Sequence, residues 1–194
     1  MKTMILASAN AHKIEEFQEQ FPDYHVQSLK DIGFDEEIEE TGKTFEENSM
    51  IKARAVVQFL KRQKKNVDFV VADDSGLCVD ALHGEPGIYS ARYSGDHNPP
   101  ANRARLLKEL QGKENRKARF VCVLVKMTMD EHYKVYEGFV DGKILTEERG
   151  DNSFGYNSLF YSNELRKTFG EATIEERMNV SHRGRAIEKL KKDL

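Results

Sequence analysis

Short apolar runs alternate along this chain with longer segments of helical periodicity, and this order limits the fold to the α/β class. Residues 3–7 form the first apolar run and are expected to be a buried strand. A polar turn and a helix to about Phe21 follow it. A long helix is predicted from Thr44 to about Lys64, because Thr44 and Glu47 have the spacing of a capping box.

The rest of the chain continues this alternation. The remaining predicted segments are a strand at 25–29, an acidic loop at 31–40, a short buried strand at 69–72, an irregular stretch at 84–100, a helix at 102–110, strands at 118–129 and 133–139, a turn at 141–142, a loop at 150–157 and a last helix from Ser181. Two long strands in succession favour a mixed sheet over an all-parallel one. A length of 194 residues suits one domain, 1–194, which could be built as two lobes around a cleft.

Composition excludes several classes of protein. The formal net charge of −3 lacks the basic excess of most nucleic-acid binders, so no nucleic-acid partner is expected. No apolar run approaches the roughly 20 residues of a membrane span, and the N-terminal run is too short for a signal peptide. Cys78 and Cys122 are far apart and form no C-x-x-C pair, which is typical of reduced thiols in a cytoplasmic protein, with Cys122 in the core.

The turn at 8–13 joins the first strand to the first helix and could bind phosphate. Backbone N–H groups at a helix start carry partial positive charge. Ser8 and Asn10 add neutral donors, and Lys13 adds a cation. An ordinary strand-to-helix turn with a capping Asn is the simpler interpretation of this segment alone.

Gly42, Lys43 and Thr44 resemble the end of a phosphate-binding P-loop. The motif requires another glycine five residues before Gly42, where this chain has Glu37, inside an acidic run. Carboxylates would repel a phosphate at this place, so the P-loop interpretation is rejected.

Asp73 and Asp74 follow the predicted strand 69–72 at its C-terminal end, where ligands of α/β sheets collect. Adjacent carboxylates are costly unless a cation or solvent compensates for their charge. Magnesium commonly binds through one or two carboxylates together with water and substrate phosphates. A hydrated turn in which Asp73 caps backbone amides explains the pair equally well.

Three residues that come before Asp73 and Asp74 in the sequence could form, together with Asp74, a cluster that binds metal and phosphate. Glu40 ends the acidic run, and Asn48 and Lys52 lie four apart on the long helix and so share one face. The ordinary alternative for Lys52 is a solvated helical lysine.

Ser181, His182 and Arg183 lie at the start of the last helix, a terminus that favours anions. Arg183 could clamp a phosphate or donate to a purine carbonyl oxygen. Phe154 and Tyr156, in the loop with glycine, could stack on a base. Taken alone, the His–Arg pair is more typical of a surface and the two aromatic residues of a core. No zinc or serine-hydrolase motif accompanies them.

Together these segments resemble the inosine triphosphate pyrophosphatases, also called non-standard purine NTP pyrophosphatases. The matching stretches are SANAHKIEEF at 8–17, EETGKTFEENSMIKA at 39–53, ADDSGLCVDALHGEPGIYSARYSG at 72–95, RFVCVLV at 119–125, FGYN at 154–157 and SHRGRA at 181–186. Their order and spacing span nearly the whole chain.

The resemblance implies a homodimer with a mixed, twisted sheet flanked by helices and a cleft between two lobes. It implies Mg²⁺-dependent hydrolysis of ITP, dITP and XTP to monophosphate and pyrophosphate, which cleanses the nucleotide pool. Glu40 and Asp74 would be the metal ligands, with Asp74 also the catalytic general base. The implied substrate contacts are Ser8, Asn10, Lys13, Lys52 and Ser75 for the phosphates, and Phe154, Gly155, Tyr156, Asn157, Arg177, His182 and Arg183 toward the base.

Three positions depart from the family's pattern. Asn157 stands where the family's FGYD motif has its aspartate. Arg177 stands where the family has a lysine, four residues before the serine of the SHR motif. Cys78 stands where an acidic or apolar residue is common. The first two bear on base selectivity more than on hydrolysis.

Two other functions fit the same residues less well. A Maf-like pyrophosphatase of similar fold would act on pyrimidine or other nucleotides, but the SHR segment favours a purine. A nucleotide sensor without catalysis would have no need of Glu40 and Asp74, which are both present.

Overall fold

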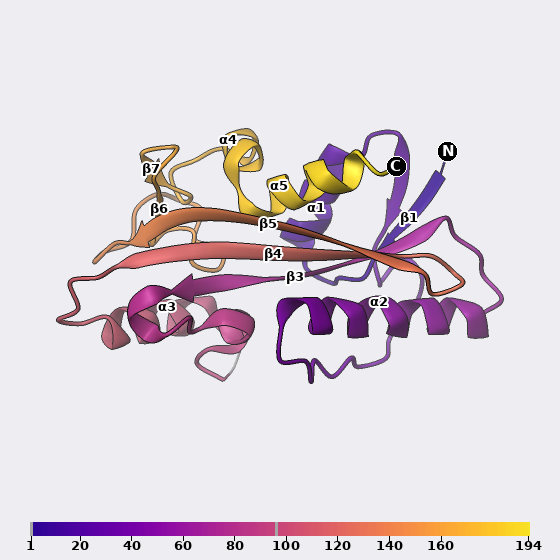
Figure 1. Ribbon diagram of the computed structural model, residues 1–194, viewed down its shortest axis with the longest axis horizontal. Helices are drawn as coiled ribbons and strands as arrows, with labels where there is room; N and C mark the ends of the chain where they lie inside the picture. The colour runs from indigo at the N-terminus through magenta and orange to yellow at the C-terminus, as the bar shows by residue number, and fades with distance from the viewer. Residues whose placement is uncertain (1, 96) are drawn as a thin grey trace. The chain divides into compact units, whose positions relative to one another are not determined.

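The computed structural model describes residues 2–95 and 97–194; Met1 and Asp96, which the predicted domain 1–194 includes, lie outside the described residues. In the described part of the chain, no helix has the length and apolar character needed to cross a membrane. The elements in chain order are β1 (Lys2–Leu6), α1 (Ala11–Gln20), β2 (Tyr24–Gln27), α2 (Phe45–Arg62), β3 (Phe69–Val79), the 3₁₀ helices η1 (Asp80–Leu82) and η2 (Gly87–Arg92), α3 (Pro99–Glu109), β4 (Lys117–Met127), β5 (Tyr133–Ile144), β6 (Phe160–Ser162), β7 (Lys167–Thr168), α4 (Ile174–Val180) and α5 (His182–Lys191) (Figure 1).

The sheet combines parallel and antiparallel neighbours. Hydrogen-bonded strands follow the order β2-β1-β3-β4-β5-β6-β7. Strand β1 pairs in parallel with β2 and β3, whereas β6 pairs antiparallel with β5 and β7. Parallel neighbours need a crossover connection, and α1 and α2 lie in the two connections concerned. The expected α/β class, with a mixed sheet flanked by helices, is confirmed.

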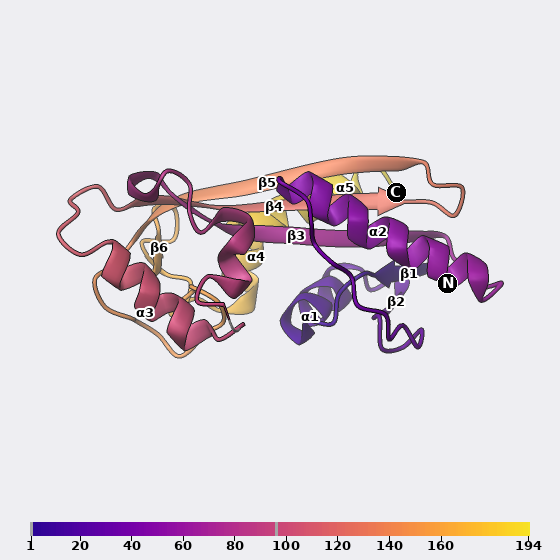
Figure 2. The same ribbon diagram turned by 90° about the horizontal axis from the view of Figure 1, so that it is seen from below.

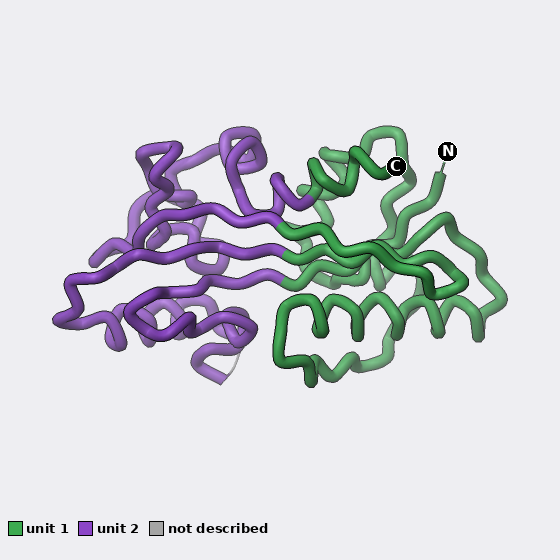
Figure 3. Tube along the Cα trace, in the orientation of Figure 1, with its two compact units in different colours: residues 1–74, 123–137, 187–194 green, residues 75–122, 138–186 purple. Residues whose placement is uncertain are grey.

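The chain divides into two compact units (Figure 3). Unit 1 comprises Met1–Asp74, Val123–Glu137 and Ile187–Leu194, and unit 2 comprises Ser75–Cys122 and Gly138–Ala186. Each unit is assembled from separate stretches, and β3, β4, β5 and α5 each contribute residues to both. That the chain is one domain therefore stays a prediction.

The core of unit 1 lies between its strands and helix α2. Ile5 and Val70 of the strands meet Val56 and Leu60 of α2 in one cluster of fully buried side chains. Burying a side chain of this size contributes roughly 1.5–3 kcal/mol. Helix α1 lies on the opposite face of the strands from α2, with Phe17 fully buried (Figures 1 and 2).

The core of unit 2 contains a group of packed aromatic rings. The ring centroid of Phe120 lies 4.5 Å from that of Phe160 and 5.9 Å from that of Phe169. Leu106 of α3 joins this cluster, and α3 and α4 lie on opposite faces of the strands of unit 2 (Figures 1 and 2). Cys122 is fully buried in β4, as expected.

The predicted end of the strand at 69–72 is wrong. Strand β3 continues to Val79, so Asp73 and Asp74 lie inside a strand and not after one. The apolar residues beyond the acids explain the continuation, because Leu77 and Val79 are fully buried. Four polar or small residues in a row, Asp-Asp-Ser-Gly, had indicated a turn.

The turn predicted at 141–142 is also wrong, because β5 runs through both residues. Asp141 accepts two hydrogen bonds from Arg119 of β4, at 2.7 and 3.0 Å. A Cβ atom on Gly142 would lie 2.3 Å from the carbonyl oxygen of Tyr161, so the glycine permits close approach of β6. Strand pairing thus overrides the local turn preference of Asp-Gly.

Helix α2 begins where the sequence indicated. Thr44 Oγ1 accepts a hydrogen bond from the N–H of Glu47 at 3.1 Å. The other half of the predicted capping box differs, because the Glu47 carboxylate accepts from the N–H of Lys43, at 2.5 Å. Residues 31–40 form neither helix nor strand, as expected for a loop.

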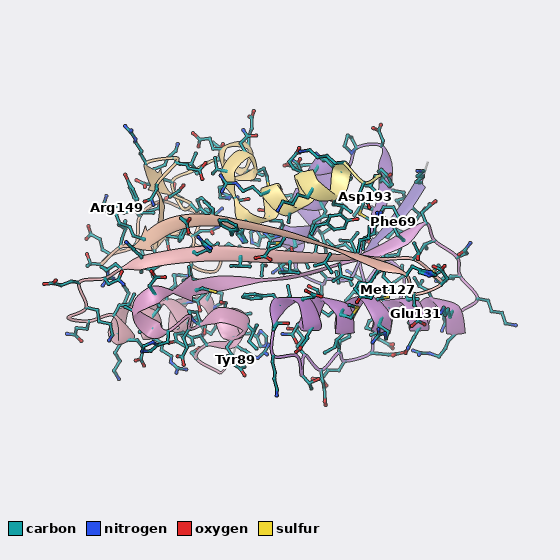
Figure 4. The ribbon with its side chains drawn as sticks, in the orientation of Figure 1. Phe69, Tyr89, Met127, Glu131, Arg149 and Asp193 are labelled. Carbon is teal, nitrogen blue, oxygen red and sulfur yellow. The ribbon has the colours of Figure 1, made fainter. Side chains whose placement is uncertain are left out.

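Asp193, marked in Figure 4, fixes the C-terminal end of unit 1. Its carboxylate binds the ammonium groups of Lys134 at 2.7 Å and Lys126 at 2.9 Å, and the hydroxyl of Tyr136 at 2.5 Å. The hydrogen bonds from Lys134, Tyr136 and Lys126 hold the pKa of Asp193 far below its ordinary value. The last residues of the chain are therefore attached to β4 and β5 by charge-assisted bonds.

Candidate active site

The turn between β1 and α1 carries the first predicted phosphate contacts. Asn10 caps α1, since its Oδ1 accepts hydrogen bonds from the N–H groups of His12 and Lys13 at 3.1 and 3.3 Å. Ser8 Oγ accepts from the N–H of Asn10 at 3.1 Å. Both bonds use acceptor atoms, so the Ser8 hydroxyl and the Asn10 amide nitrogen can still donate to a phosphate. The capping and phosphate-binding interpretations are therefore compatible.

Two lysines reach the same backbone carbonyl from different helices. Lys13 of α1 binds Asp73 Oδ1 at 2.5 Å and lies 3.4 Å from the carbonyl oxygen of Asp73. Lys52 of α2 donates to that carbonyl oxygen at 2.8 Å. The Asp73 side chain is completely buried, and its charge offsets that of Lys13. Two cations held side by side suit a polyphosphate.

Lys52 also contacts the two predicted metal ligands. Its Nζ lies 3.2 Å from Glu40 Oε1 and 3.4 Å from Asp74 Oδ1. Asn48, which is completely buried, donates to Asp74 Oδ2 at 3.2 Å and accepts from the N–H of Gly42 at 2.8 Å. The structure thus brings Glu40, Asn48, Lys52 and Asp74 together in unit 1.

Gly42 has a structural reason for being glycine. A Cβ atom there would lie 2.5 Å from Asn48 Oδ1 and 2.8 Å from the Asn48 backbone nitrogen. The loop that carries Glu40 can therefore approach the start of α2 only through a residue without a side chain. The resemblance of Gly42-Lys43-Thr44 to a P-loop is explained by this packing.

The surroundings raise the pKa of both Asp74 and Lys52, but for different reasons. Burial raises the pKa of Asp74, and the nearby Glu40 raises it further, against the opposing charges of Lys52 and Lys13. Burial disfavours the charge of Lys52, but the carboxylates of Asp74, Glu40 and Asp73 outweigh it and raise the pKa of Lys52. Lys52 therefore remains an ammonium at neutral pH, while Asp74 is a stronger proton acceptor than an ordinary aspartate.

Glu40 and Asp74 fit a divalent metal by their chemistry. Both offer hard oxygen donors. Their mutual repulsion, which adds to the effect of burial in raising the pKa of Asp74, is what a bound cation would relieve. Among residues 2–95 and 97–194, no group of three or more His, Cys, Asp or Glu side chains is arranged to hold a metal. Two carboxylates are a common protein contribution to a Mg²⁺ site, with water and substrate phosphates completing the coordination.

In unit 2, helices α4 and α5 meet at a tight turn. Ser181 Oγ accepts from the N–H of Gly184 at 3.0 Å, which confirms the predicted cap. A Cβ atom on Gly184 would lie 1.8 Å from the carbonyl oxygen of Met178 in α4. Sequence reasoning missed α4, although a Thr-x-x-Glu capping box beginning at Thr173 was a usable signal.

The two residues after Ser181 have different partners. The ring of His182 stacks on that of Phe120, with centroids 4.7 Å apart and planes inclined by 12°. Arg183, which is only 5% exposed, donates to Ser75 Oγ at 2.9 Å. Ser75 is the first residue of unit 2 and directly follows Asp74 in the chain.

The loop at 150–157 holds the predicted stacking residues. Tyr156 is 4% exposed, and its hydroxyl donates to the carbonyl oxygen of Ser90 at 2.7 Å. The interpretation of Tyr156 as a core residue is therefore confirmed. Phe154 is partly exposed, and Gly155 adopts a φ of +54°.

The two substitutions that depart from the family's pattern have internal roles here. The Asn157 N–H donates to the carbonyl oxygen of Phe154 at 3.0 Å, and its amide nitrogen lies 3.5 Å from Asn152 Oδ1. Arg177 is 7% exposed and donates to the carbonyl oxygen of Ala172 at 2.9 Å.

Sequence reasoning assigned no anchoring role to Asp73. The signal was present, because a second acid beside Asp74 needs a counter-charge and Lys13 and Lys52 were both predicted nearby. The carbonyl of Asp73 could not have been singled out, since every residue has one.

The α/β sheet and the buried lysine–carboxylate cluster place the chain in the class of α/β proteins whose site suits a polyphosphate. The chain belongs to the Ham1 family, whose family model matches residues 4–193.

Relatives and solved structures agree with this membership. The chain is 48% identical to a protein named dITP/XTP pyrophosphatase from Clostridium perfringens, over 100% of this chain and 98% of the relative. It is 46% identical to a Bacillus subtilis protein of the same name, over 99% and 96% of the two chains. The solved structure of the Staphylococcus aureus Ham1 protein is 43% identical, with a TM-score of 0.85 over 97% of this chain and 96% of that one. The family resemblance found in the sequence is confirmed.

Proposed function

We propose that this protein hydrolyses the deaminated purine nucleoside triphosphates ITP, dITP and XTP to monophosphate and pyrophosphate, and so cleanses the nucleotide pool. The observation that carries this function is the convergence of Lys13 and Lys52 on Asp73, beside Glu40 and Asp74. Relatives that carry the name dITP/XTP pyrophosphatase, and match over nearly their full length, support the substrate class.

The reaction breaks the anhydride bond between the α- and β-phosphates. A water molecule attacks the α-phosphorus, and Asp74, whose pKa is raised by burial, accepts the proton from that water. The β- and γ-phosphates leave as pyrophosphate, and Lys13 and Lys52 stabilise its developing charge. Because Asp73 already holds both ammonium groups, little reorganisation is needed when the charge develops.

Glu40 and Asp74 would hold Mg²⁺, which when bound neutralises phosphate charge. Lys52 lies between these carboxylates as their counter-charge and would turn toward a phosphate when substrate enters. Ser8 and Asn10 would donate to phosphate oxygens, Ser8 from its hydroxyl and Asn10 from its amide nitrogen.

Base selectivity would come from unit 2. Arg183 carries only donors, which suits the 6-oxo group of hypoxanthine or xanthine but offers no acceptor to the 6-amino group of adenine. His182, next to Arg183 in the chain, would also contact the base, and Phe154 would stack on the purine. Gly155 and Arg177 are further proposed contacts toward the base, with Ser75 supporting the phosphates, whereas Tyr156 and Asn157 would act by holding the loop that carries Phe154.

We also propose that the protein acts as a homodimer in the cytoplasm. The dimer rests on the resemblance to the family, and the cytoplasm on the two cysteines, which are typical of reduced thiols. The moderate net charge of −3 agrees with a nucleotide rather than a nucleic acid as the partner. The elution volume of the purified protein, compared with that of standards, would test the dimer.

Pyrophosphate release from ITP, XTP, dITP, GTP, ATP, dUTP and dTTP, each with Mg²⁺, tests the function. We expect the highest kcat/KM for ITP, dITP and XTP. Preferred turnover of dUTP or dTTP would instead indicate a Maf-like specificity. Binding without turnover of any nucleotide would indicate a sensor.

A further inference from the structure

A buried arginine in unit 2 holds the loop that carries Phe154. Arg103 lies on α3 and is 5% exposed. Its Nη1 donates to the carbonyl oxygens of Ser153 at 2.8 Å and Gly155 at 3.0 Å. These two carbonyls flank Phe154 in the chain, so one guanidinium fixes the backbone on both sides of that residue.

The backbone of Phe154 itself is bonded as well. Its N–H donates to Asn152 Oδ1 at 3.1 Å, and its carbonyl oxygen accepts from the N–H of Asn157 at 3.0 Å. Gly155 has a φ of +54°, a left-handed conformation that glycine adopts without strain. A Cβ atom at Gly155 would meet nothing within 4 Å, so the backbone angle and not crowding accounts for the glycine.

The charge of Arg103 is compensated within the same unit. Its Nε lies 3.0 Å from Glu148 Oε2, and the same oxygen accepts from the Ser158 hydroxyl at 2.7 Å. Burial acts to raise the pKa of Glu148, but the Ser158 hydroxyl and Arg103 together lower it, so the carboxylate stays ionised. Ser158 directly follows the loop at 150–157, and the network therefore ties the loop to α3 at its middle and at its end.

We propose that Arg103 is a positioning residue for base recognition, which orients Phe154 as a stacking platform by holding the carbonyls of Ser153 and Gly155. The inference rests on the proposed function, because it assumes that a purine stacks on Phe154. Stacking requires a ring held at a defined angle, and a loop free to move would lose binding energy to the entropy of ordering it. The effect of Arg103 should therefore appear in nucleotide binding and not in the chemical step.

Two substitutions separate this role from general stability. Arg103→Met removes the charge and leaves two part-buried carbonyls without their donor. Arg103→Lys keeps the charge but lacks the planar fork that reaches both carbonyls and Glu148. We expect the KM for dITP to rise about tenfold in Arg103→Met, and less in Arg103→Lys, with much smaller changes in kcat. The preference for dITP over dUTP should fall, because a pyrimidine gains less from stacking.

Inorganic tripolyphosphate provides a probe without a base. Its inhibition constant against dITP should stay at the wild-type value in both Arg103 variants. Arg105→Met is the matched control, because Arg105 lies on the same helix, is 46% exposed at its side chain and binds Tyr93 instead of the loop. We expect it to leave the KM for dITP unchanged.

The possible results separate a failure of the inference about Arg103 from a failure of the proposed function. A wild-type KM and selectivity in Arg103→Met and Arg103→Lys would overturn the inference, and so would a parallel loss of tripolyphosphate and dITP binding. If Arg103→Met does not fold, which thermal unfolding reports, Arg103→Lys carries the test. If the wild-type protein releases no pyrophosphate from dITP, the proposed function has failed before any variant is measured.

Discussion

The two units hold their candidate site residues in different ways. In unit 1 the charged side chains bind one another, as Lys52 does with Glu40 and Asp74. In unit 2 the arginines also bind neutral oxygens: Arg103 binds two loop carbonyls beside its ion pair with Glu148, and Arg183 binds the Ser75 hydroxyl. A substrate phosphate and a metal would replace ion pairs in unit 1. In unit 2, hydrogen bonds to neutral oxygens already hold the two arginines. We therefore expect unit 1 to act on the triphosphate of any nucleotide and unit 2 to tell one base from another.

Removal of divalent metal should have the largest effect. We expect essentially complete loss of pyrophosphate release after chelation and full recovery with Mg²⁺, because Glu40 and Asp74 form an all-oxygen ligand pair. The loss should be the same for ITP and ATP, since the metal would act at the triphosphate. Activity that survives thorough chelation would show that the reaction proposed for unit 1 needs no divalent metal.

Asp74→Asn should lower kcat by about 10²–10⁴-fold, the usual contribution of a general base. Every nucleotide in the panel should be affected by the same factor. Asp80→Asn, at an exposed acid close by in the chain, is the control and should keep wild-type turnover. A folded Asp74→Asn protein with near wild-type kcat would show that another group takes the proton.

The same substitution should stabilise the metal-free fold at neutral pH. Burial raises the pKa of Asp74 in the folded state, so between its ordinary and raised pKa the folded protein binds more protons than the unfolded chain. Stability is therefore lost as the pH rises through that window, and the neutral variant avoids the loss. In chelator, Asp74→Asn should have the higher Tm at pH 7, and the difference should vanish below about pH 4. An unchanged Tm difference across this range would contradict the assignment.

Arg183→Ala tests the other side of the comparison. We expect kcat/KM for ITP to fall by an amount on the order of 1–3 kcal/mol, the cost of leaving buried polar partners unpaired. ATP should be affected less, because its 6-amino group gains little from a donor, and the ITP-to-ATP ratio should shrink. If both nucleotides slow by the same factor, Arg183 is a phosphate clamp and the division between the units fails.

The sequence predicted the charged cluster of unit 1 better than the loop of unit 2. Helical spacing correctly placed Asn48 and Lys52 on one face, and their partners were acids that already stood out in the sequence. Arg103 gave no such signal, because a lone arginine in a polar helix is usually solvated. Its partners are main-chain carbonyls, which no side-chain pattern can reveal.

Strand ends were missed for a related reason. Local preference indicated a turn after Ala72 and another at Asp141, yet both sites lie inside long strands. In each case the deciding contacts come from residues distant in sequence, such as the pairing of Asp141 with Arg119. Turn preferences are weak compared with the burial of residues on either side, such as Leu77 and Val140.

The smallest predicted effect concerns Asn157, where the family's pattern has an aspartate. The Asn157 amide nitrogen lies 3.5 Å from Asn152 Oδ1, the same atom that accepts the N–H of Phe154. In Asn157→Asp a carboxylate oxygen would face this acceptor, and rotating the Asn152 amide would only turn its NH₂ group toward the Phe154 N–H. The loop should therefore loosen by about 0.5–1 kcal/mol, since the bond is long and only partly buried.

This change should raise the KM for ITP roughly two- to fivefold, which corresponds to that free energy, and leave kcat nearly unchanged. Asn157→Ala removes the donor without adding charge, so the difference between the Asp and Ala variants isolates the repulsion at Asn152. We expect the Asp variant to bind ITP more weakly than the Ala variant at neutral pH, while inhibition by tripolyphosphate stays the same in both. Tighter ITP binding in Asn157→Asp would mean that the side chain at this position meets the base directly. In that case the contact between residue 157 and Asn152 would not be what holds the loop that carries Phe154.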